Sequence, residues 1–194
     1  MADITSDAAG HRTEAQERPG STPASDQGRR LAGPELISCV ELLYFAYRDF
    51  TSDPDTILEQ YGFGRAHHRV LHFVHRNPGL KVAELLEILK ITKQSLARVL
   101  KQLVDEGFII QRAGSEDRRE RRLYLSAKGG RLTDKLTQIQ VKRVEGALAT
   151  LGPGADVLAR QFLFAMINEK DRSQVEILIR GQRVDSAGEP GSNG

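Results

Sequence analysis

The chain has 194 residues, of which 28% are charged and 39% hydrophobic, a balance typical of soluble globular proteins rather than membrane or fibrous ones. No apolar run approaches the roughly 18 residues that a membrane-spanning helix needs, and the first ten residues lack the features of a secretory signal. The single cysteine excludes an internal disulfide framework and fits a reducing compartment, so we expect a cytoplasmic protein. The net charge of +2 is too small to indicate a nucleic-acid partner by itself.

The composition separates a folded central part from two polar ends. Residues 1–33 and 182–194 are rich in glycine, proline, serine and charged residues and contain few apolar side chains. Such segments cannot bury enough surface to offset the entropy of ordering them. We therefore expect both ends to be disordered and the fold to span 34–181.

Helical periodicity predicts two helices at the start of the folded part. The first spans 34–50, with a proline well placed in its first turn, and Asp53-Pro54-Asp55 is expected to end it. The second spans 65–76 and ends at the turn sequence Asn77-Pro78-Gly79.

Two shorter helices follow, at 82–89 and 92–106, with a break at Lys90-Ile91 between them. Thr92 is a suitable N-cap for the second of them, and Gly107 is a suitable residue to end it. Two short helices joined by a few residues are typical of a helix-turn-helix.

Beyond Gly107 the apolar period changes from that of a helix to that of a strand. Residues 108–112 and 122–126 are rich in aliphatic and aromatic side chains, and a charged loop separates them. A hairpin directly after a helix-turn-helix forms the wing of a winged helix. Two long helices are then expected at 127–151 and 154–180. The predicted fold class is mainly α with a small β-hairpin wing, a winged helix-turn-helix with flanking helices.

The helix at 92–106 has one apolar and one polar face. At about 100° per residue, Leu96, Val99, Leu100 and Leu103 form a stripe suited to burial, whereas the exposed side chains are Lys93, Gln94, Ser95, Arg98 and Lys101. A recognition helix places such residues against the major groove, where glutamine can bridge adenine and arginine can bridge guanine. An ordinary solvated face has the same appearance, so this helix alone does not identify a DNA-binding protein.

The predicted wing carries the clearer signal. Between Arg112 and Arg131 there are four more basic than acidic residues, an excess larger than that of the whole chain. An arginine-rich hairpin beside a groove-sized helix can reach the minor groove, where the negative potential is greatest. The two features together predict binding to double-stranded DNA.

These residues resemble the MarR/SlyA family of bacterial regulators over 63–129. The matching stretches, in family order and spacing, are Tyr61-Gly62-Phe63, Arg69-Val70-Leu71, residues 78–85, residues 91–107, Glu116-Asp117-Arg118-Arg119, and Leu125-Ser126-Ala127-Lys128-Gly129. The stretch 63–71 is similar to an α-proteobacterial PetP-like branch. Lys81 departs from the family, which often has a serine or threonine helix cap at this place.

The resemblance implies a homodimeric transcription regulator, expected to be a repressor, on a pseudo-palindromic operator. Dimerisation helices would lie in 34–62 and 127–181, around a DNA-binding lobe at 63–126. Apolar residues late in the chain, such as Phe162 and Ile177, also favour a dimer, because the terminal helices must bury their apolar faces somewhere. The family's Asp-x-Arg wing motif falls on Asp117 and Arg119, with the acid bracing the wing and the arginine entering the minor groove. The other wing residues expected at DNA are Arg118 and Arg121.

The resemblance also implies a small-molecule effector bound between the dimer helices and the DNA-binding lobe. An aromatic carboxylate would suit a set of side chains on the first two helices, namely Tyr44, Tyr47, Arg48, His68 and His72, since an arginine can donate two parallel hydrogen bonds to a carboxylate. Surface arginines and core tyrosines would give the same pattern.

Two further candidates are weaker. Cys39 lies where the peroxide-sensing branch of the family has a reactive cysteine, but Tyr44 is about 140° around the helix, and a buried packing cysteine is the expectation. His68 and His72 have zinc-site spacing, but 127–151 contains no histidine of the kind the zinc-responsive branch uses, so no metal is expected.

Catalysis is not expected. The sequence has no glycine-rich phosphate loop, no HExxH motif and no nucleophile elbow, so neither an enzyme nor a cofactor is predicted. The alternative to DNA binding that remains is a winged helix acting as a protein-interaction module.

Overall fold

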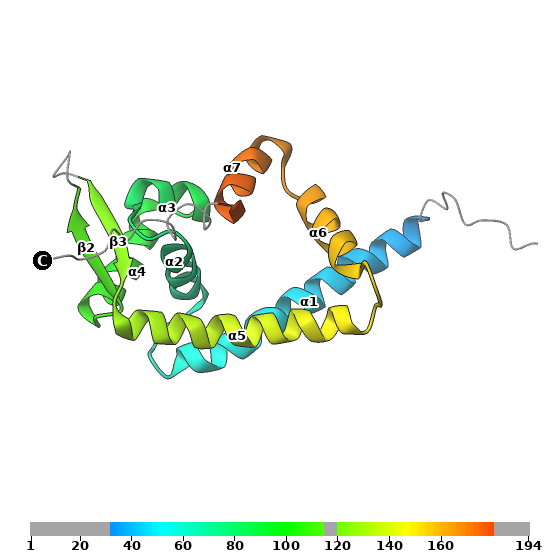
Figure 1. The fold of residues 1–194 in the computed structure, drawn as a ribbon, viewed down its shortest axis with the longest axis horizontal. Helices are drawn as coiled ribbons and strands as arrows, with labels where there is room; N and C mark the ends of the chain where they lie inside the picture. Colours follow the sequence, from blue (N-terminus) through cyan, green and yellow to red (C-terminus); the bar gives the residue numbers. More distant parts are fainter. Residues whose placement is uncertain (1–31, 115–119, 181–194) are drawn as a thin grey trace, which may run out of the picture. The chain divides into compact units, whose positions relative to one another are not determined.

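The computed structural model describes residues 32–114 and 120–180 (Figure 1). These residues form a mainly helical chain with one small sheet, which confirms the predicted fold class. The elements are α1 (Gly33–Glu59), α2 (Arg65–Arg76), β1 (Leu80–Lys81), α3 (Val82–Leu89), α4 (Lys93–Asp105), β2 (Ile109–Ala113), β3 (Arg121–Leu125), α5 (Ala127–Ala149), α6 (Ala155–Ala165) and α7 (Glu169–Arg180). The chain divides after Val40 into two compact units, and the description below concerns the unit that begins at Glu41 unless α1 is named. No helix in the described ranges is both long and apolar enough to span a bilayer.

Helix α1 continues past the point where we expected it to end. The prediction of a break at Asp53-Pro54-Asp55 is wrong, because Pro54 lies inside the helix and is buried. Proline removes one backbone donor and crowds the preceding turn. Hydroxyl groups on both sides of it donate to carbonyls one turn earlier: Thr51 Oγ1 donates to Tyr47 O at 2.9 Å, and Thr56 Oγ1 donates to Ser52 O at 3.2 Å.

The C-terminal segment is also different from the prediction, since 154–180 forms two helices rather than one. The break between α6 and α7 is held by Arg172, whose guanidinium donates to Ala165 O at 2.7 Å and to Ile167 O at 3.0 Å. These carbonyls lie at the end of α6, where the last carbonyl groups of a helix have no N–H partner within the helix. Asn168 precedes the acidic first turn of α7, and both features are typical of a helix start. The prediction missed this start because the apolar spacing continued across it.

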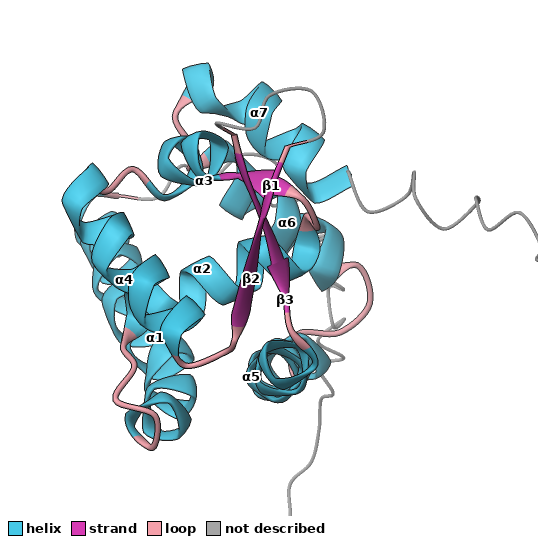
Figure 2. Cartoon of the chain, turned by 90° about the vertical axis from the view of Figure 1, so that its left-hand side faces the viewer, coloured by secondary structure: helices cyan, strands magenta, loops and turns pink. Residues whose placement is uncertain are grey.

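The core of the larger unit lies between α2, α3, α4, the sheet and the first half of α5. Its fully buried side chains include Leu71, Leu85, Leu103, Phe108 and Leu123. The strands, magenta in Figure 2, form one antiparallel sheet in the order β1-β3-β2. Strand β1, which pairs Leu80 with Leu123, was not predicted because two residues are too short to show a strand period.

A close backbone approach joins the end of α4 to the start of α5. Ser126 caps α5 by accepting from Gly129 N at 3.0 Å, and its hydroxyl donates to Gly107 O at 2.6 Å. Ser126 N donates to Phe108 O at 3.0 Å. A Cβ atom on Gly129 would lie only 2.1 Å from Phe108 O, so this position has no room for a side chain.

Two adjacent glycines allow a matched test of this joint. We expect Gly129→Ala to lower the free energy of unfolding by about 3 kcal/mol, because the added methyl group must push two backbone segments apart. Gly130→Ala meets no atom within 4 Å and should instead raise stability by about 0.5–1 kcal/mol, as alanine usually does inside a helix. Urea denaturation at one protein concentration measures both; equal effects would contradict the proposed close approach.

Candidate nucleic-acid interface

Helix α4 presents the polar face that its sequence predicts. Leu96, Val99, Leu100 and Leu103 are buried, whereas the residues expected at DNA are exposed, namely Thr92, Lys93, Gln94, Ser95, Arg98 and Lys101. Thr92 is the N-cap, and its Oγ1 accepts from Ser95 N at 3.1 Å. The cap fixes the first turn, which is the part of a recognition helix that lies nearest the base edges.

The basic residues of α4 differ in their surroundings. Lys101 forms an ion pair with Asp105 one turn later, yet its side chain is 76% exposed. Within the described ranges, the Arg98 side chain has neither a hydrogen bond nor an ion pair. Its guanidinium can therefore bind an external acceptor without first breaking an internal contact.

The base of the wing is a short hairpin of β2 and β3, and it carries several arginines. The Arg112 guanidinium lies over the ring of Tyr124, 5.1 Å from the ring centre. Arg121 is exposed at the start of β3. Asp117, Arg118 and Arg119 lie outside the described residues, so the bracing role expected of Asp117 and the groove contact of Arg119 stay predictions.

One acidic residue, Glu120, lies among these basic side chains, directly before β3. Glu120 Oε1 accepts from Lys81 Nζ at 2.6 Å, and Glu120 Oε2 lies 3.7 Å from Arg122 Nη2. The hydrogen bond from Lys81 to Glu120 raises the pKa of the lysine, which therefore keeps its charge. Sequence analysis missed this contact because 39 residues separate the two positions.

Lys81 is also the residue that departs from the family pattern at the start of α3. Its backbone N–H donates to Glu84 Oε2 at 2.9 Å, so a side chain in the first turn of α3 satisfies a donor there. The lysine side chain itself makes no capping contact. The start of α3 is thus supported by Glu84, and the Lys81 side chain is available to the wing.

The histidines of α2 mostly have structural roles. His67 Nδ1 accepts from Gly64 N at 3.1 Å, and its Nε2 lies 2.9 Å from Gln102 Oε1. His75 Nε2 lies 3.4 Å from Asp134 Oδ1. No group of three potential metal-binding side chains occurs in the part of the chain that the structure describes.

The expected effector residues are only partly brought together. Tyr47, His68 and His72 line a cavity of about 510 Å³, but Tyr44 and Arg48 do not. Tyr44 is 71% exposed, and Arg48 Nε donates to its neighbour Asp49 at 2.7 Å. Two arginines line this cavity, Arg65 and Arg69, and helical periodicity distinguished neither of them. The Arg69 guanidinium donates to Leu89 O at 3.1 Å, so Arg65 is the better candidate for a ligand. The Arg65 guanidinium lies 5.7 Å from the Tyr47 ring centre and binds Asp55 at 2.8 Å.

Cys39 also differs from expectation, because it is exposed rather than buried. It lies on α1 among other exposed apolar residues, including Leu36, Val40 and Leu43. An apolar helix face exposed in a single chain is buried only if a second molecule covers it.

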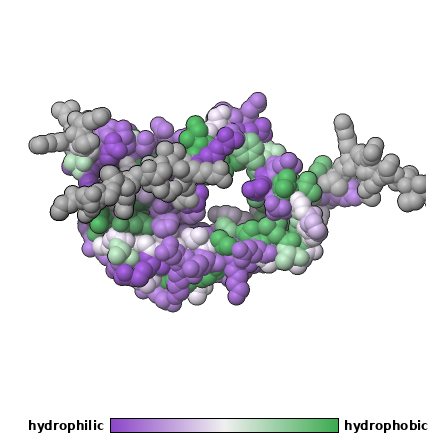
Figure 3. Space-filling view, viewed as in Figure 1, coloured by the Kyte–Doolittle hydropathy of each residue, from purple (hydrophilic) through white to green (hydrophobic). Residues whose placement is uncertain are grey.

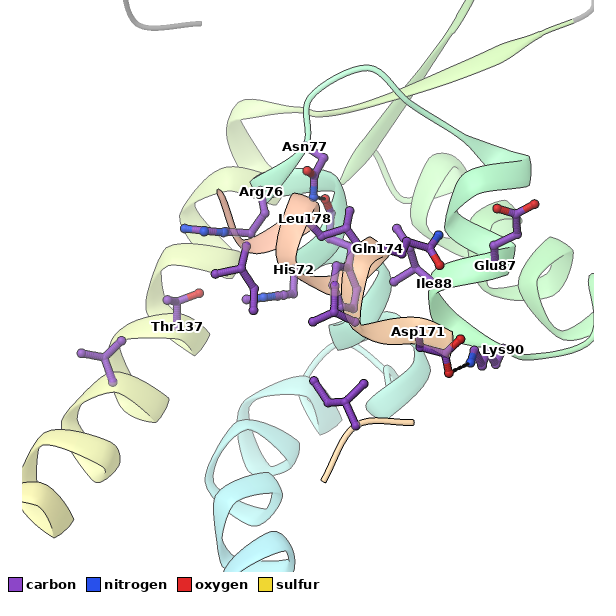
Figure 4. Close-up of a pocket in the computed structure, with 15 residues that line it drawn as sticks. His72, Arg76, Asn77, Glu87, Ile88, Lys90, Thr137, Asp171, Gln174 and Leu178 are labelled. Carbon is purple, nitrogen blue, oxygen red and sulfur yellow. Dashed lines mark hydrogen bonds and ion pairs between the residues drawn. The ribbon is translucent and has the colours of Figure 1, made fainter. Parts of the chain in front are cut away.

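A second cavity, not predicted from sequence, has a volume of about 710 Å³ and is lined by residues of α2, α3, α5 and α7 (Figure 4). Its walls are mostly apolar, with Phe73, Ile88 and Leu178 among them. At its edge Lys90 forms an ion pair with Asp171 of α7. Lys90 occupies the turn of the helix-turn-helix in a left-handed conformation, with φ of 51°.

Comparisons with known proteins agree with this architecture. A model of the MarR family matches residues 61–120. The HTH-type transcriptional regulator PetP of Rhodobacter capsulatus is 45% identical over 148 residues, which are 76% of this chain and 89% of that protein. Among solved structures, the transcriptional regulator SlyA matches with a TM-score of 0.59 and 19% identity, covering 72% of this chain and 98% of its own. MarR matches with a TM-score of 0.51 and 21% identity, covering 75% and 98%.

His72 gives a prediction about pH. Burial lowers its pKa to about 4 from an ordinary 6.5, and the nearby His68, Arg76 and His75 act in the same direction. Between these values the unfolded chain binds a proton that the folded chain does not. Stability should therefore be complete above pH 6.5 and fall as the pH drops toward 4, by at most about 3 kcal/mol from this residue.

We expect His72→Phe to reduce this acid-dependent fall, measured by urea denaturation at several pH values. His75→Gln is the matched control, because His75 is on the same helix but exposed. Burial also lowers the pKa of His68, so a smaller slope should remain in His72→Phe. An unchanged slope in that variant would show that His72 is not the titrating group.

Proposed function

Because the chain belongs to the MarR family, we propose that it is a cytoplasmic, sequence-specific DNA-binding transcription regulator that acts as a repressor. The observation that carries this proposal is the exposed polar face of α4, whose first turn is held by the Thr92 cap and which is followed directly by an arginine-rich hairpin. A winged helix binds DNA through these two elements, the helix in the major groove and the hairpin in the minor groove.

Within this proposal, Gln94, Ser95, Arg98 and Lys101 face the major groove. Arg98 is best suited to reading a base, since a guanidinium without an internal partner can bind guanine O6 and N7 together. Lys93 in the first turn would contact phosphate. In the minor groove, the proposal relies on Arg119, with Arg118 and Arg121 beside it and Asp117 as the brace.

We also propose that the active form is a homodimer built from 34–62 and 127–181. Many large apolar side chains of these segments are exposed in the single chain, and Figure 3 shows hydrophobic residues at the surface over α5 and α6. They include Leu36, Ile37, Val40, Tyr44, Phe45, Val144, Leu158, Phe162, Leu163 and Ile177. Apolar surface of this extent is uncommon on monomers and typical of subunit interfaces.

The dimer is tested by light scattering at micromolar concentration, which should return twice the 21.5 kDa mass of one chain. Phe162→Glu, which places a charge in the proposed interface, should shift the mass toward that of one chain. Ala83→Glu adds the same charge at an exposed position of α3, outside the proposed interface, and is the control for added charge. A monomeric wild-type protein would contradict the proposal.

The small-molecule effector stays a prediction of the family resemblance. The cavity that contains Tyr47, His68 and His72 is the place that best fits an aromatic carboxylate, with Arg65 in the role that we expected of Arg48. Because Arg65 is already paired with Asp55, a carboxylate ligand would have to compete with that contact.

Selection from randomised duplex DNA tests the main proposal. We expect a pseudo-palindrome whose half-sites are about 10 base pairs apart, bound with a steep dependence on salt. Arg98→Ala should weaken binding to the selected site by about 1–3 kcal/mol and relax the preference at one base pair of each half-site.

Lys142→Ala is the matched control, because it removes a positive charge that α4 and the wing do not provide. Unchanged selectivity in Arg98→Ala would contradict the assignment of this residue to the major groove. Failure of the wild-type dimer to enrich any sequence would favour the alternative, a winged helix that binds a protein partner.

A further inference from the structure

Glu120 has an unexpected charge for its position. It lies at the loop end of the hairpin, directly before β3, and its neighbouring side chains, among them Arg112, Arg121 and Arg122, are basic. A carboxylate beside a phosphate backbone weakens binding through simple electrostatics. Its presence in a DNA-binding wing therefore calls for a structural role.

The contacts of Glu120 hold the point at which the chain re-enters the sheet. Its backbone carbonyl accepts from Gly114 N at 3.1 Å, which closes the hairpin at this level. One carboxylate oxygen accepts from Lys81 Nζ at 2.6 Å, and the other faces Arg122. Glu120 is thus bound to the opposite strand through its backbone and to the start of α3 through its side chain.

Lys81 is well placed to provide that second attachment. It is the last residue of β1, pairs with Arg122 across the sheet and directly precedes α3. Since Glu84 already accepts from the Lys81 backbone N–H, the helix start does not depend on the Lys81 side chain. A serine or threonine here could cap α3, but neither could reach Glu120.

From these contacts we propose that Lys81 and Glu120 are a wing-positioning pair, which sets the direction of the wing relative to the helix-turn-helix. This inference rests on the proposed DNA-binding function. The pair is partly exposed, with side-chain exposures of 37% and 30%, so we expect little effect on overall stability. Its effect is on where the wing arginines lie when α4 occupies the major groove.

The direction in which one substitution changes DNA affinity distinguishes a positioning role of Glu120 from a purely electrostatic one. Glu120→Ala removes a negative charge near DNA, so electrostatics alone predicts tighter binding to every sequence. If the carboxylate positions the wing, Glu120→Ala should bind the selected operator about 3- to 10-fold more weakly, a loss at the low end of that expected for one direct base contact. Its binding to unrelated DNA should be equal to or tighter than that of the wild type.

The proposed partner is tested by a double-mutant cycle. Lys81→Ser, which installs the family's usual cap residue, should keep the melting temperature of the wild type and lose operator affinity to a similar extent. The double variant K81S/E120A should be no weaker than either single variant, because both remove the same contact. The exchanged pair K81E/E120K should recover operator affinity.

The measurement is operator and nonspecific affinity for each variant across salt concentrations, with thermal melts to verify folding. Glu120→Ala binding the operator as tightly as the wild type, or additive losses in the double variant, would overturn the positioning pair and leave the DNA-binding function intact. A wild-type protein that selects no operator would overturn both.

Discussion

The carbonyl of Phe108 lies where the recognition helix, the wing and the long helix α5 meet. It accepts a hydrogen bond from Ser126 N, and Gly129 of α5 passes so close to it that no side chain fits. Phe108 directly follows Gly107, which ends α4 with φ of 75°. Since the two strands of the wing lie between Phe108 and Ser126 in sequence, this contact closes the hairpin at its base and fixes the start of α5 against the end of α4.

The side chain of Phe108 extends the same joint into the core. Its ring contacts Phe63 edge to face, with ring centres 5.0 Å apart, and the ammonium of Lys128 lies 4.0 Å from its centre on the α5 side. Lys128 also donates to Glu106 O at the end of α4. The geometry of the DNA-binding lobe thus depends on a few residues around one buried ring, and the wing-positioning pair acts at the opposite end of the same hairpin.

The parts of this fold that could be predicted are those determined by neighbours in sequence. The helix-turn-helix was predicted because apolar spacing, the Thr92 cap and Gly107 all act within one or two helical turns. The course of α1 through Pro54 was not predicted, because proline is read locally as the end of a helix, whereas Pro54 is buried inside α1. The break before α7 was missed because Arg172 and Asn168 act on a backbone whose apolar spacing still resembled one helix.

In the candidate site too, features set by neighbours in sequence could be predicted, and those that depend on distant contacts could not. Exposure along α4 follows from helical geometry alone, so its polar face could be predicted residue by residue. The Lys81–Glu120 contact depends on the pairing of β1 with β3, which no periodic pattern indicated. Arg65 rather than Arg48 lines the cavity beside Tyr47, which depends on how α1 and α2 pack and which helical periodicity could not show.

The two cavities of the lobe have His72 and Phe73 in common, since both residues line both spaces. A side chain occupies one rotamer at a time, so the rotamer that suits a molecule in one cavity is also the rotamer presented to the other. The shapes of the two cavities therefore depend on each other. A molecule that changes the rotamer of either side chain in one cavity would change the wall of the other, and two such molecules would then alter each other's affinity without sharing a site.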